Sequence, residues 1–212
     1  VVFSSGAGIV DWKTQKLLVS HNLTPDQVVR ACDAFLDLNI DFMLHDPIPN
    51  ARPFVYSRGS SVNSDFDARL EMLAQHGTPF KPQDSNRSAS QLVGICPAGD
   101  PNHPFEALKS ELSDMAVIRA TSPLDHRSIW FEVFSAEATK SNAAKWIAQK
   151  HGLHRSDVLA VGNDYNDWDL LRWAGAAYVM DNAPLALREE FECVPSIEGT
   201  GVSQAIGSWL GR

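Results

Sequence analysis

The stretch Asp157-Val158-Leu159-Ala160-Val161-Gly162-Asn163-Asp164-Tyr165-Asn166-Asp167 joins a short apolar run to a glycine and a group of acidic and amide side chains. The run over 158–161 is typical of a strand buried on both faces in a parallel sheet, and the glycine permits the tight turn that a following helix needs. In open α/β sheets, ligands bind at the carboxyl ends of the strands. Because the oxygens of Asn163, Asp164 and Asp167 are ligands that hard cations prefer, the stretch predicts a Mg²⁺ site.

A turn without a metal explains the same residues. Asp164 would cap a helix that begins near Asn166, and the helix dipole would favour Asp167 and Asp169 in its first turn. Taken alone, the stretch leaves both interpretations open.

The pattern around this stretch predicts an α/β protein. From residue 139 onward, buried strands alternate with helices, as in a parallel α/β unit. Before residue 136 the pattern mixes hairpins and helices, as in an α+β module, so we expect a domain boundary near residue 136. The predicted strands cover 1–10 with a turn at 4–8, 16–20, 41–44, 91–96, 117–121, 128–134, 158–161, 176–180 and 193–194; the predicted helices cover 65–75, 105–115, 140–150, 167–173, 184–191 and 202–210.

One further helix is predicted from its capping residues. Thr24 and Gln27, three residues apart, form a capping box, and Pro25 takes the first helical position. An apolar face follows. That face comprises Val28, Val29, Cys32, Phe35 and Leu36. The segment 54–59, with Asn63, Asp65 and Arg69, is interpreted as a structural loop rather than as a substrate-recognition element.

The composition excludes several classes of protein. The 212 residues carry a net charge of −8 without a compact basic run, which argues against nucleic-acid binding. The three cysteines are widely spaced, so we expect neither a disulfide framework nor a zinc site, and a reducing cytoplasm is the simpler location. The sequence contains no apolar run of about 18 residues, so we do not expect a membrane span. Oligomeric state is left open.

Lys140 opens one of the predicted helices. A cation in the first turn opposes the helix dipole by about 0.3–1 kcal/mol, so its presence calls for a nearby anion. Its amine and the exposed N–H groups of that turn would together bind phosphate, although an exposed lysine is the ordinary alternative. Together with residues 162–167, Lys140 predicts a phosphoryl-transfer site without its nucleophile.

These motifs also carry a family resemblance. Thr139-Lys140, the stretch 158–167, and the segments 170–175 and 179–183 resemble the C-terminal half of the haloacid dehalogenase superfamily, in its Cof-type, sugar-phosphatase-like branch. Residues 4–11 resemble the start of the large inserted cap of that branch. The resemblance implies a core-to-cap connection over 1–10, an α/β cap of the C2 type over 11–135, and the C-terminal part of a Rossmann-like core over 136–212.

The resemblance implies roles for the residues of the acidic stretch. Lys140 would neutralise the phosphate and the nucleophilic aspartate, Asn166 would contact the phosphoryl group, and Asp167 would support the metal or its water. The family pattern is Gly-Asp-x-x-Asn-Asp, so Asn163 stands where an aspartate usually binds Mg²⁺. Either Asp164 takes over this role or the metal is held more weakly.

The first two catalytic motifs of the family are absent from this chain. Neither Asp65-Phe66-Asp67 nor Asp167-Trp168-Asp169 follows an apolar strand, as the nucleophilic Asp-x-Asp does. We therefore expect that roughly 50 preceding residues are missing. The expected function is a Mg²⁺-dependent phosphatase for a small phosphorylated metabolite, such as a sugar phosphate, acting through an aspartyl-phosphate, with this chain alone inactive. The alternative is a non-catalytic binding or assembly module whose acids are helix caps.

Overall fold

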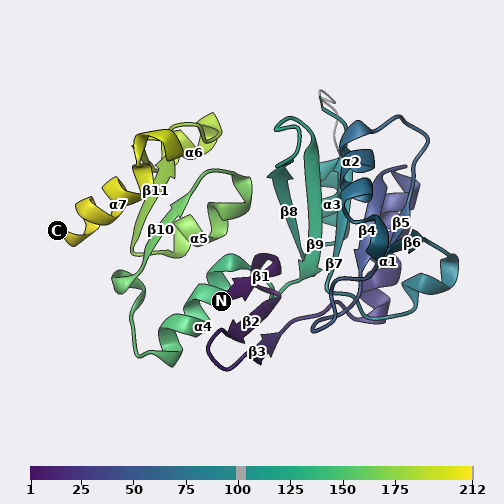
Figure 1. Cartoon of the computed structure of the whole chain (residues 1–212), viewed down its shortest axis with the longest axis horizontal. Coiled ribbons are helices and arrows are strands. Elements are labelled where there is room, and N and C mark those ends of the chain that lie inside the picture. Colours follow the sequence, from purple (N-terminus) through teal and green to yellow (C-terminus); the bar gives the residue numbers. More distant parts are fainter. Residues whose placement is uncertain (99–103, 212) are drawn as a thin grey trace. The chain divides into compact units, whose positions relative to one another are not determined.

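The computed structural model describes residues 1–98 and 104–211, with residue 197 described by its backbone only. The chain forms two compact units, Val1–Ala138 and Thr139–Arg212. Each unit has its own β-sheet structure (Figure 1). Each also has its own apolar clusters.

A mixed sheet forms the centre of the first unit. In the described residues it has six strands in the order β6-β5-β4-β7-β9-β8. Only β5 and β6 pair in parallel; the other neighbouring strands of this sheet are antiparallel. The strands are β4 (Asp41–His45), β5 (Phe54–Ser57), β6 (Gly77–Pro79), β7 (Gln91–Cys96), β8 (Met115–Thr121) and β9 (Ile129–Ser135).

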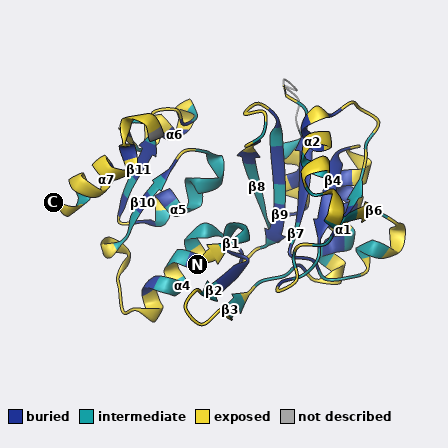
Figure 2. Ribbon diagram, viewed as in Figure 1, coloured by how far each residue is buried: buried dark blue, intermediate teal, exposed yellow. Residues whose placement is uncertain are grey.

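Helices cover both faces of this sheet, and its central strands β4 and β7 are almost entirely buried (Figure 2). Phe35 of α1 and Leu108 of α3 share one apolar cluster with Phe131 of β9, whereas Phe66 of α2 packs with Trp130 on the opposite face. The helical segments are α1 (Pro25–Asp37), α2 (Ser64–Met72), η2 (Ala74–His76), η3 (Pro82–Ser85) and α3 (Phe105–Glu111).

A small antiparallel sheet completes the first unit. It consists of β1 (Val2–Phe3), β2 (Gly8–Asp11) and β3 (Lys16–Ser20), and the 3₁₀ turn η1 (Ser4–Gly6) joins the first two. Ala7 packs in one cluster with Phe134 and Ala138. The N-terminal strands therefore belong to the first unit and share a core with β9.

The second unit is a parallel α/β layer. In the described residues its sheet has the order β10-β11-β12, and both neighbouring pairs are parallel. Ala160 and Val179 from the strands pack with Leu171 and Leu187 from the helices. The elements are α4 (Lys140–Lys150), η4 (Arg155–Asp157), β10 (Leu159–Gly162), η5 (Tyr165–Asp167), α5 (Trp168–Trp173), β11 (Ala176–Met180), α6 (Leu185–Glu190), β12 (Glu192–Val194), η6 (Ile197–Gly199) and α7 (Gly201–Leu210).

The local signals in the sequence predict most of these elements, and the capping box at Thr24 and Gln27 is confirmed. Three expectations are wrong. Leu36, assigned to the buried face of α1, is 46% exposed. Residues 54–57 form β5, because they pair with β4 and β6 rather than looping over the surface. Met115 is not helical but opens β8, since α3 ends at Glu111.

Candidate active site

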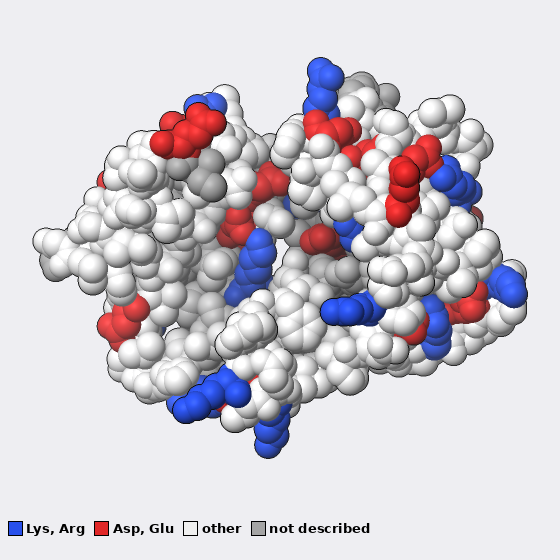
Figure 3. Space-filling model, in the orientation of Figure 1, with Lys and Arg blue, Asp and Glu red and all other residues white. Residues whose placement is uncertain are grey.

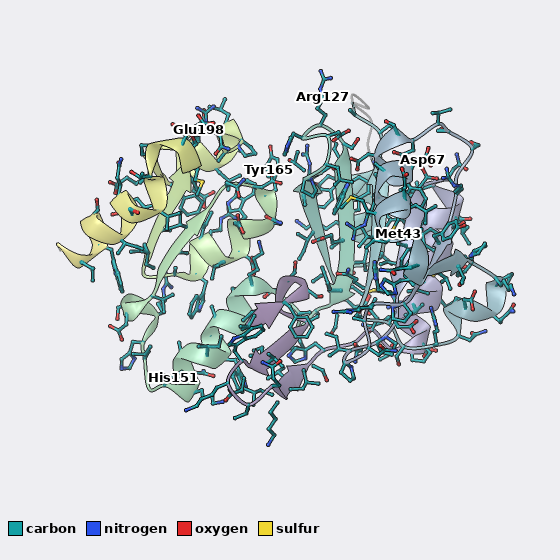
Figure 4. All side chains as sticks on the ribbon, in the orientation of Figure 1. Met43, Asp67, Arg127, His151, Tyr165 and Glu198 are labelled. Atoms are coloured by element: carbon teal, nitrogen blue, oxygen red, sulfur yellow. The ribbon has the colours of Figure 1, made fainter. Side chains whose placement is uncertain are left out.

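The candidate site begins at the carboxyl end of β10. This strand ends at Gly162, the 3₁₀ turn η5 follows over Tyr165–Asp167, and α5 begins at Trp168. Tyr165 lies in this connection (Figure 4). Since β10 pairs in parallel with β11, the acidic segment lies at the sheet edge expected for a ligand site in this kind of layer.

Gly162 allows Asp167 to lie against the end of the strand. A Cβ atom at Gly162 would lie 2.6 Å from Cβ of Asp167 and 2.8 Å from its Oδ2. Real Cβ atoms do not approach neighbours this closely, so any larger residue would displace the carboxylate. In the native arrangement, Asp167 Oδ2 accepts a hydrogen bond of 3.0 Å from the backbone N–H of Asn163.

The other oxygen of Asp167 binds Lys140. The ammonium group of Lys140 forms an ion pair and a hydrogen bond with Asp167 Oδ1. The two side chains are 27% and 15% exposed, so the pair is shielded from water on most sides. We expected an anion close to Lys140, because a cation in the first turn of a helix is disfavoured by the helix dipole. That anion is Asp167, which lies 27 residues further along the chain.

Two N–H groups at the start of α4, those of Ser141 and Asn142, already have partners within the chain. Ser141 N donates to Asp169 Oδ2 at 2.9 Å, and Asn142 N donates to the hydroxyl of Thr139 at 3.1 Å. The expectation that these groups are open for phosphate is therefore wrong, because a carboxylate and a capping hydroxyl satisfy them. These two bonds leave the predicted contact between the amine of Lys140 and phosphate unaffected.

The remaining predicted site residues lie in the same connection. Asp164 is half-buried, and its Oδ1 accepts a hydrogen bond of 2.8 Å from Tyr165 N, so it caps the turn η5. Asn163 is exposed and Asn166 is half-buried. Within residues 1–98 and 104–211, neither amide side chain has a hydrogen-bond partner in the chain. The capping interpretation therefore describes Asp164 correctly, whereas Asp167, expected in that interpretation only to be favoured by the dipole of the following helix, binds Lys140.

The donor types in this segment fit a hard divalent cation. Asn163 offers a neutral amide oxygen and Asp164 offers a carboxylate, whereas both oxygens of Asp167 already accept hydrogen bonds. Across the described residues, no three His, Cys, Asp or Glu side chains are grouped so as to hold a metal ion. The segment can thus supply part of a magnesium site but not a full set of charged ligands.

One residue that contributes to this arrangement was not assigned a site role from the sequence. Asp169 was interpreted only as an acid favoured by the dipole of α5, but it caps α4 through Ser141, 28 residues earlier. No local pattern reveals this contact, because it depends on the packing of α4 against α5. The capping hydroxyl of Thr139, by contrast, is readable from its position just before the helix.

The conspicuous polar residues of the first unit are bound to one another. Asp65 is 3% exposed and accepts hydrogen bonds of 2.7 Å from both Ser122 Oγ and Trp130 Nε1. Arg69 stacks on the ring of Trp130, with Cζ 4.3 Å from the ring centroid. Asn63 caps α2 and donates to Asp41 Oδ2. These contacts fix α2 onto the sheet.

Charged side chains of both signs are interspersed on the surface. On the face drawn in Figure 3, Lys and Arg form no continuous stripe. In the second unit, Arg172 binds Glu190 through two hydrogen bonds of 2.6 and 2.8 Å, and this pairing lowers the pKa of Glu190. The three cysteines are free thiols, and Cys193 is exposed. The described part of the chain contains no helix with the length and apolar character needed to cross a membrane.

Comparison with models of protein families shows to which family the chain belongs. The model for haloacid dehalogenase-like hydrolases matches residues 1–206. The chain belongs to the haloacid dehalogenase-like hydrolases. The family inferred from the motifs is thereby confirmed.

The curated relatives match shorter segments. The phosphoglycolate phosphatase of Archaeoglobus fulgidus is 31% identical over 77 residues, which are 36% of this chain and 34% of that protein. The Bacillus subtilis protein YxeH is 35% identical over 54 residues, which are 26% of this chain and 20% of that protein. The matched segments thus span about a third or less of these relatives.

Solved structures superpose on nearly the whole chain. A subclass IIB sugar phosphatase superposes with a TM-score of 0.74 at 12% identity, covering 97% of this chain and 73% of its own. A protein from Streptococcus mutans gives a TM-score of 0.76 at 15% identity, covering 100% and 76%. At these identities the likeness concerns the fold. It confirms the expected α/β class, with a Rossmann-like core and a cap, and fits the Cof-type branch.

Proposed function

We propose that the protein containing this chain is a magnesium-dependent phosphatase that hydrolyses a phosphomonoester of a small metabolite, with a sugar phosphate as the expected substrate. Membership of a hydrolase family and the phosphatase names of its relatives support the reaction class. The observation that carries the proposal is the ion pair of Lys140 with Asp167 at the carboxyl end of a parallel strand. A shielded lysine held by a carboxylate at this edge suits a dianionic phosphate.

In this proposal, each residue has a separate task. Lys140 neutralises charge on the phosphoryl oxygens, and the amide of Asn166 donates a hydrogen bond to one of them. Asp167 orients the amine of Lys140 through the contact already formed. The nucleophile is an aspartate outside this chain, which forms an aspartyl-phosphate that water then hydrolyses. We assign that aspartate outside the chain because neither Asp-x-Asp sequence within it follows an apolar strand.

The proposed Mg²⁺ site uses oxygens from the same segment. Asn163 and Asp164 would hold the ion, and Asp167 would support it or a bound water. When bound, Mg²⁺ would neutralise charge on the phosphoryl group during transfer. An asparagine supplies less charge than the usual aspartate, so we propose a weaker metal site than in relatives with an aspartate at this position.

The domain roles are part of the proposal. Residues 1–10 would connect core and cap, residues 11–135 would form the cap, and residues 136–212 would form the C-terminal part of the core. The boundary between the compact units, at Ala138 and Thr139, supports the second division. We propose a small phosphorylated molecule as the partner, and neither nucleic acid nor a membrane.

The proposal is tested by assaying the full-length protein on a generic aryl phosphate. We expect turnover with Mg²⁺, loss of turnover after exhaustive chelation, and recovery when Mg²⁺ is added back. Full activity after chelation would contradict the proposed need for Mg²⁺. The absence of turnover on a broad panel of phosphomonoesters would contradict the assignment as a phosphatase.

A further inference from the structure

Asp169 connects the segment that carries Lys140 to the segment that carries Asp167. Its Oδ2 accepts a hydrogen bond of 2.9 Å from Ser141 N, the residue directly after Lys140. Asp169 itself lies two residues after Asp167, in the first turn of α5. The starts of α4 and α5 are therefore joined twice, once by Lys140 with Asp167 and once by Ser141 with Asp169.

We propose that Asp169 is a positioning residue, which holds the start of α4 so that the amine of Lys140 stays on Asp167 and in reach of phosphate. This inference rests on the proposed function for the role of Lys140. The contact of Asp169 is to the backbone, so it fixes the position of the helix start rather than one flexible side chain. A lysine side chain has four rotatable bonds and would otherwise sample many positions.

The geometry favours this role over that of an ordinary helix cap. Thr139 already caps α4 through its hydroxyl and Asn142 N, so the helix has its usual N-cap without Asp169. Asp169 adds a bond from another helix and thereby ties two elements that are remote in sequence. What its removal changes most is the relation of α4 to α5, on which the Lys140–Asp167 pair depends.

The first test measures the reactivity of Lys140 in the 212-residue chain. Lysines are acetylated with trace acetic anhydride, and each rate is read by mass spectrometry relative to exposed Lys145 on the same helix. In Asp169→Ala we expect Lys140 to react about 3-fold faster or more than in the wild type, because its amine leaves Asp167 more often. An unchanged relative rate would overturn the inference.

Two further variants separate hydrogen bonding from charge and from loss of folding. Asp169→Asn keeps an acceptor oxygen without the charge, so we expect a wild-type rate for Lys140. Asp169→Glu keeps the charge but moves the carboxylate by one methylene, so we expect a raised rate. The inference would be refuted by the opposite result, in which the labelling rate of Lys140 in Asp169→Glu equals that of the wild type and the rate in Asp169→Asn equals that in Asp169→Ala. Such a result would show that the charge of Asp169, and not its hydrogen bond, positions Lys140.

A matched control removes the same kind of bond elsewhere in the second unit. Asp157 Oδ2 accepts a hydrogen bond of 2.9 Å from His154 N, and this carboxylate belongs to the turn η4, which follows the end of α4, whereas Lys140 begins that helix. Asp157→Ala should lower thermal stability much as Asp169→Ala does while leaving the relative labelling of Lys140 unchanged. If the labelling rate of Lys140 rises equally in both variants, the effect comes from a general loss of stability of the second unit, and the inference is wrong.

Activity of the full-length protein gives an independent readout. For Asp169→Ala we expect kcat/KM to fall about 10-fold or more and inhibition by inorganic phosphate to weaken, with Asp169→Asn within about 3-fold of the wild type. If Asp169→Ala raises the labelling rate of Lys140 but leaves kcat/KM unchanged, the position of Lys140 set by Asp169 does not matter for catalysis, and that part of the inference is refuted. A wild-type protein without phosphatase activity would reject the proposed function, while the labelling result would still decide the positioning.

Discussion

Asp167 is the residue on which the arrangement of the candidate site depends. One of its oxygens binds Lys140, and the other accepts the backbone N–H of Asn163. The carboxylate thus joins a helix start to the loop after β10. Its position is possible because Gly162 has no side chain.

Replacing Gly162 by alanine should therefore disturb the site more than the fold. The new Cβ would lie 2.6 Å from Asp167 Cβ, so the side chain whose carboxylate binds Lys140 must shift. We expect kcat/KM of the full-length protein to fall about 10-fold or more, measured on an aryl phosphate.

Gly207 provides the control for this substitution. A Cβ at Gly207 in α7 would meet no atom within 4 Å. Gly207→Ala should leave activity unchanged and raise the unfolding free energy by about 0.5–1 kcal/mol, because alanine favours the helix. Equal activity of the two variants would contradict the role given to Gly162.

His45 predicts a pH dependence of stability in the first unit. Burial, and secondly the charge of Arg69, lower its pKa from 6.5 to about 4. The unfolded chain takes up a proton near pH 6.5 and the folded chain only near pH 4, so stability is complete above pH 6.5 and falls as the pH decreases to 4. The expected loss from this residue is about 3 kcal/mol.

Urea unfolding at a series of pH values measures this contribution. In His45→Gln the titrating group is absent, so the decrease in stability between pH 6.5 and 4 should be smaller than in the wild type. His151 is exposed after α4, and His151→Gln should keep the wild-type slope (Figure 4). An identical slope in His45→Gln would show that the histidine does not carry the effect.

At the scale of elements, α2 is held on the sheet by the carboxylate of Asp65. Trp130 Nε1 and Ser122 Oγ both donate to it, and all three residues are buried. Asp65→Ala would leave two buried donors without acceptors, so we expect a loss of about 2–4 kcal/mol in unfolding free energy. Chemical denaturation measures it.

Asp67, two residues further along α2, is the matched comparison (Figure 4). It pairs with Arg58 at the surface, where both side chains are 47% exposed. Asp67→Ala should cost about 0.5 kcal/mol or less, because water screens such a pair. A similar cost for Asp65→Ala would mean that its hydrogen bonds contribute little.

The sequence predicts those elements whose signals are local. The apolar run before Gly162 predicts β10, and Thr24 with Gln27 predicts the start of α1. β5 was missed because its residues gain their partners from two other segments of the chain, β4 and β6, rather than from a local signal.

The same limit applies to the candidate site. The acidic segment and Lys140 are recognisable from their spacing, and the structure brings Lys140 onto Asp167. The tie between Asp169 and Ser141 needs the packing of α4 on α5, so no local pattern contains it. The prediction that Ser141 N would donate to phosphate was wrong for this reason, whereas the partner of Asn142 N, the hydroxyl of Thr139, is a local cap.

At the scale of the whole molecule, the chain carries a lysine and oxygen donors suited to phosphoryl transfer, but neither of its two Asp-x-Asp sequences, 65–67 and 167–169, follows an apolar strand-like run. The matched segments span 20% and 34% of the curated relatives YxeH and phosphoglycolate phosphatase. We therefore expect no phosphatase turnover from the 212-residue chain by itself. Turnover by this chain that Lys140→Ala abolishes would refute the assignment of the nucleophile to another segment.

The central claim is that Lys140, held by Asp167, serves phosphoryl transfer. The most direct measurement compares Lys140→Ala with Lys145→Ala in the full-length protein, using aryl phosphate hydrolysis with saturating Mg²⁺. We expect Lys140→Ala to lower kcat/KM by about 100-fold or more, and Lys145→Ala, which removes an exposed lysine of the same helix, to remain within about 2-fold of the wild type. Wild-type activity in Lys140→Ala would contradict the claim.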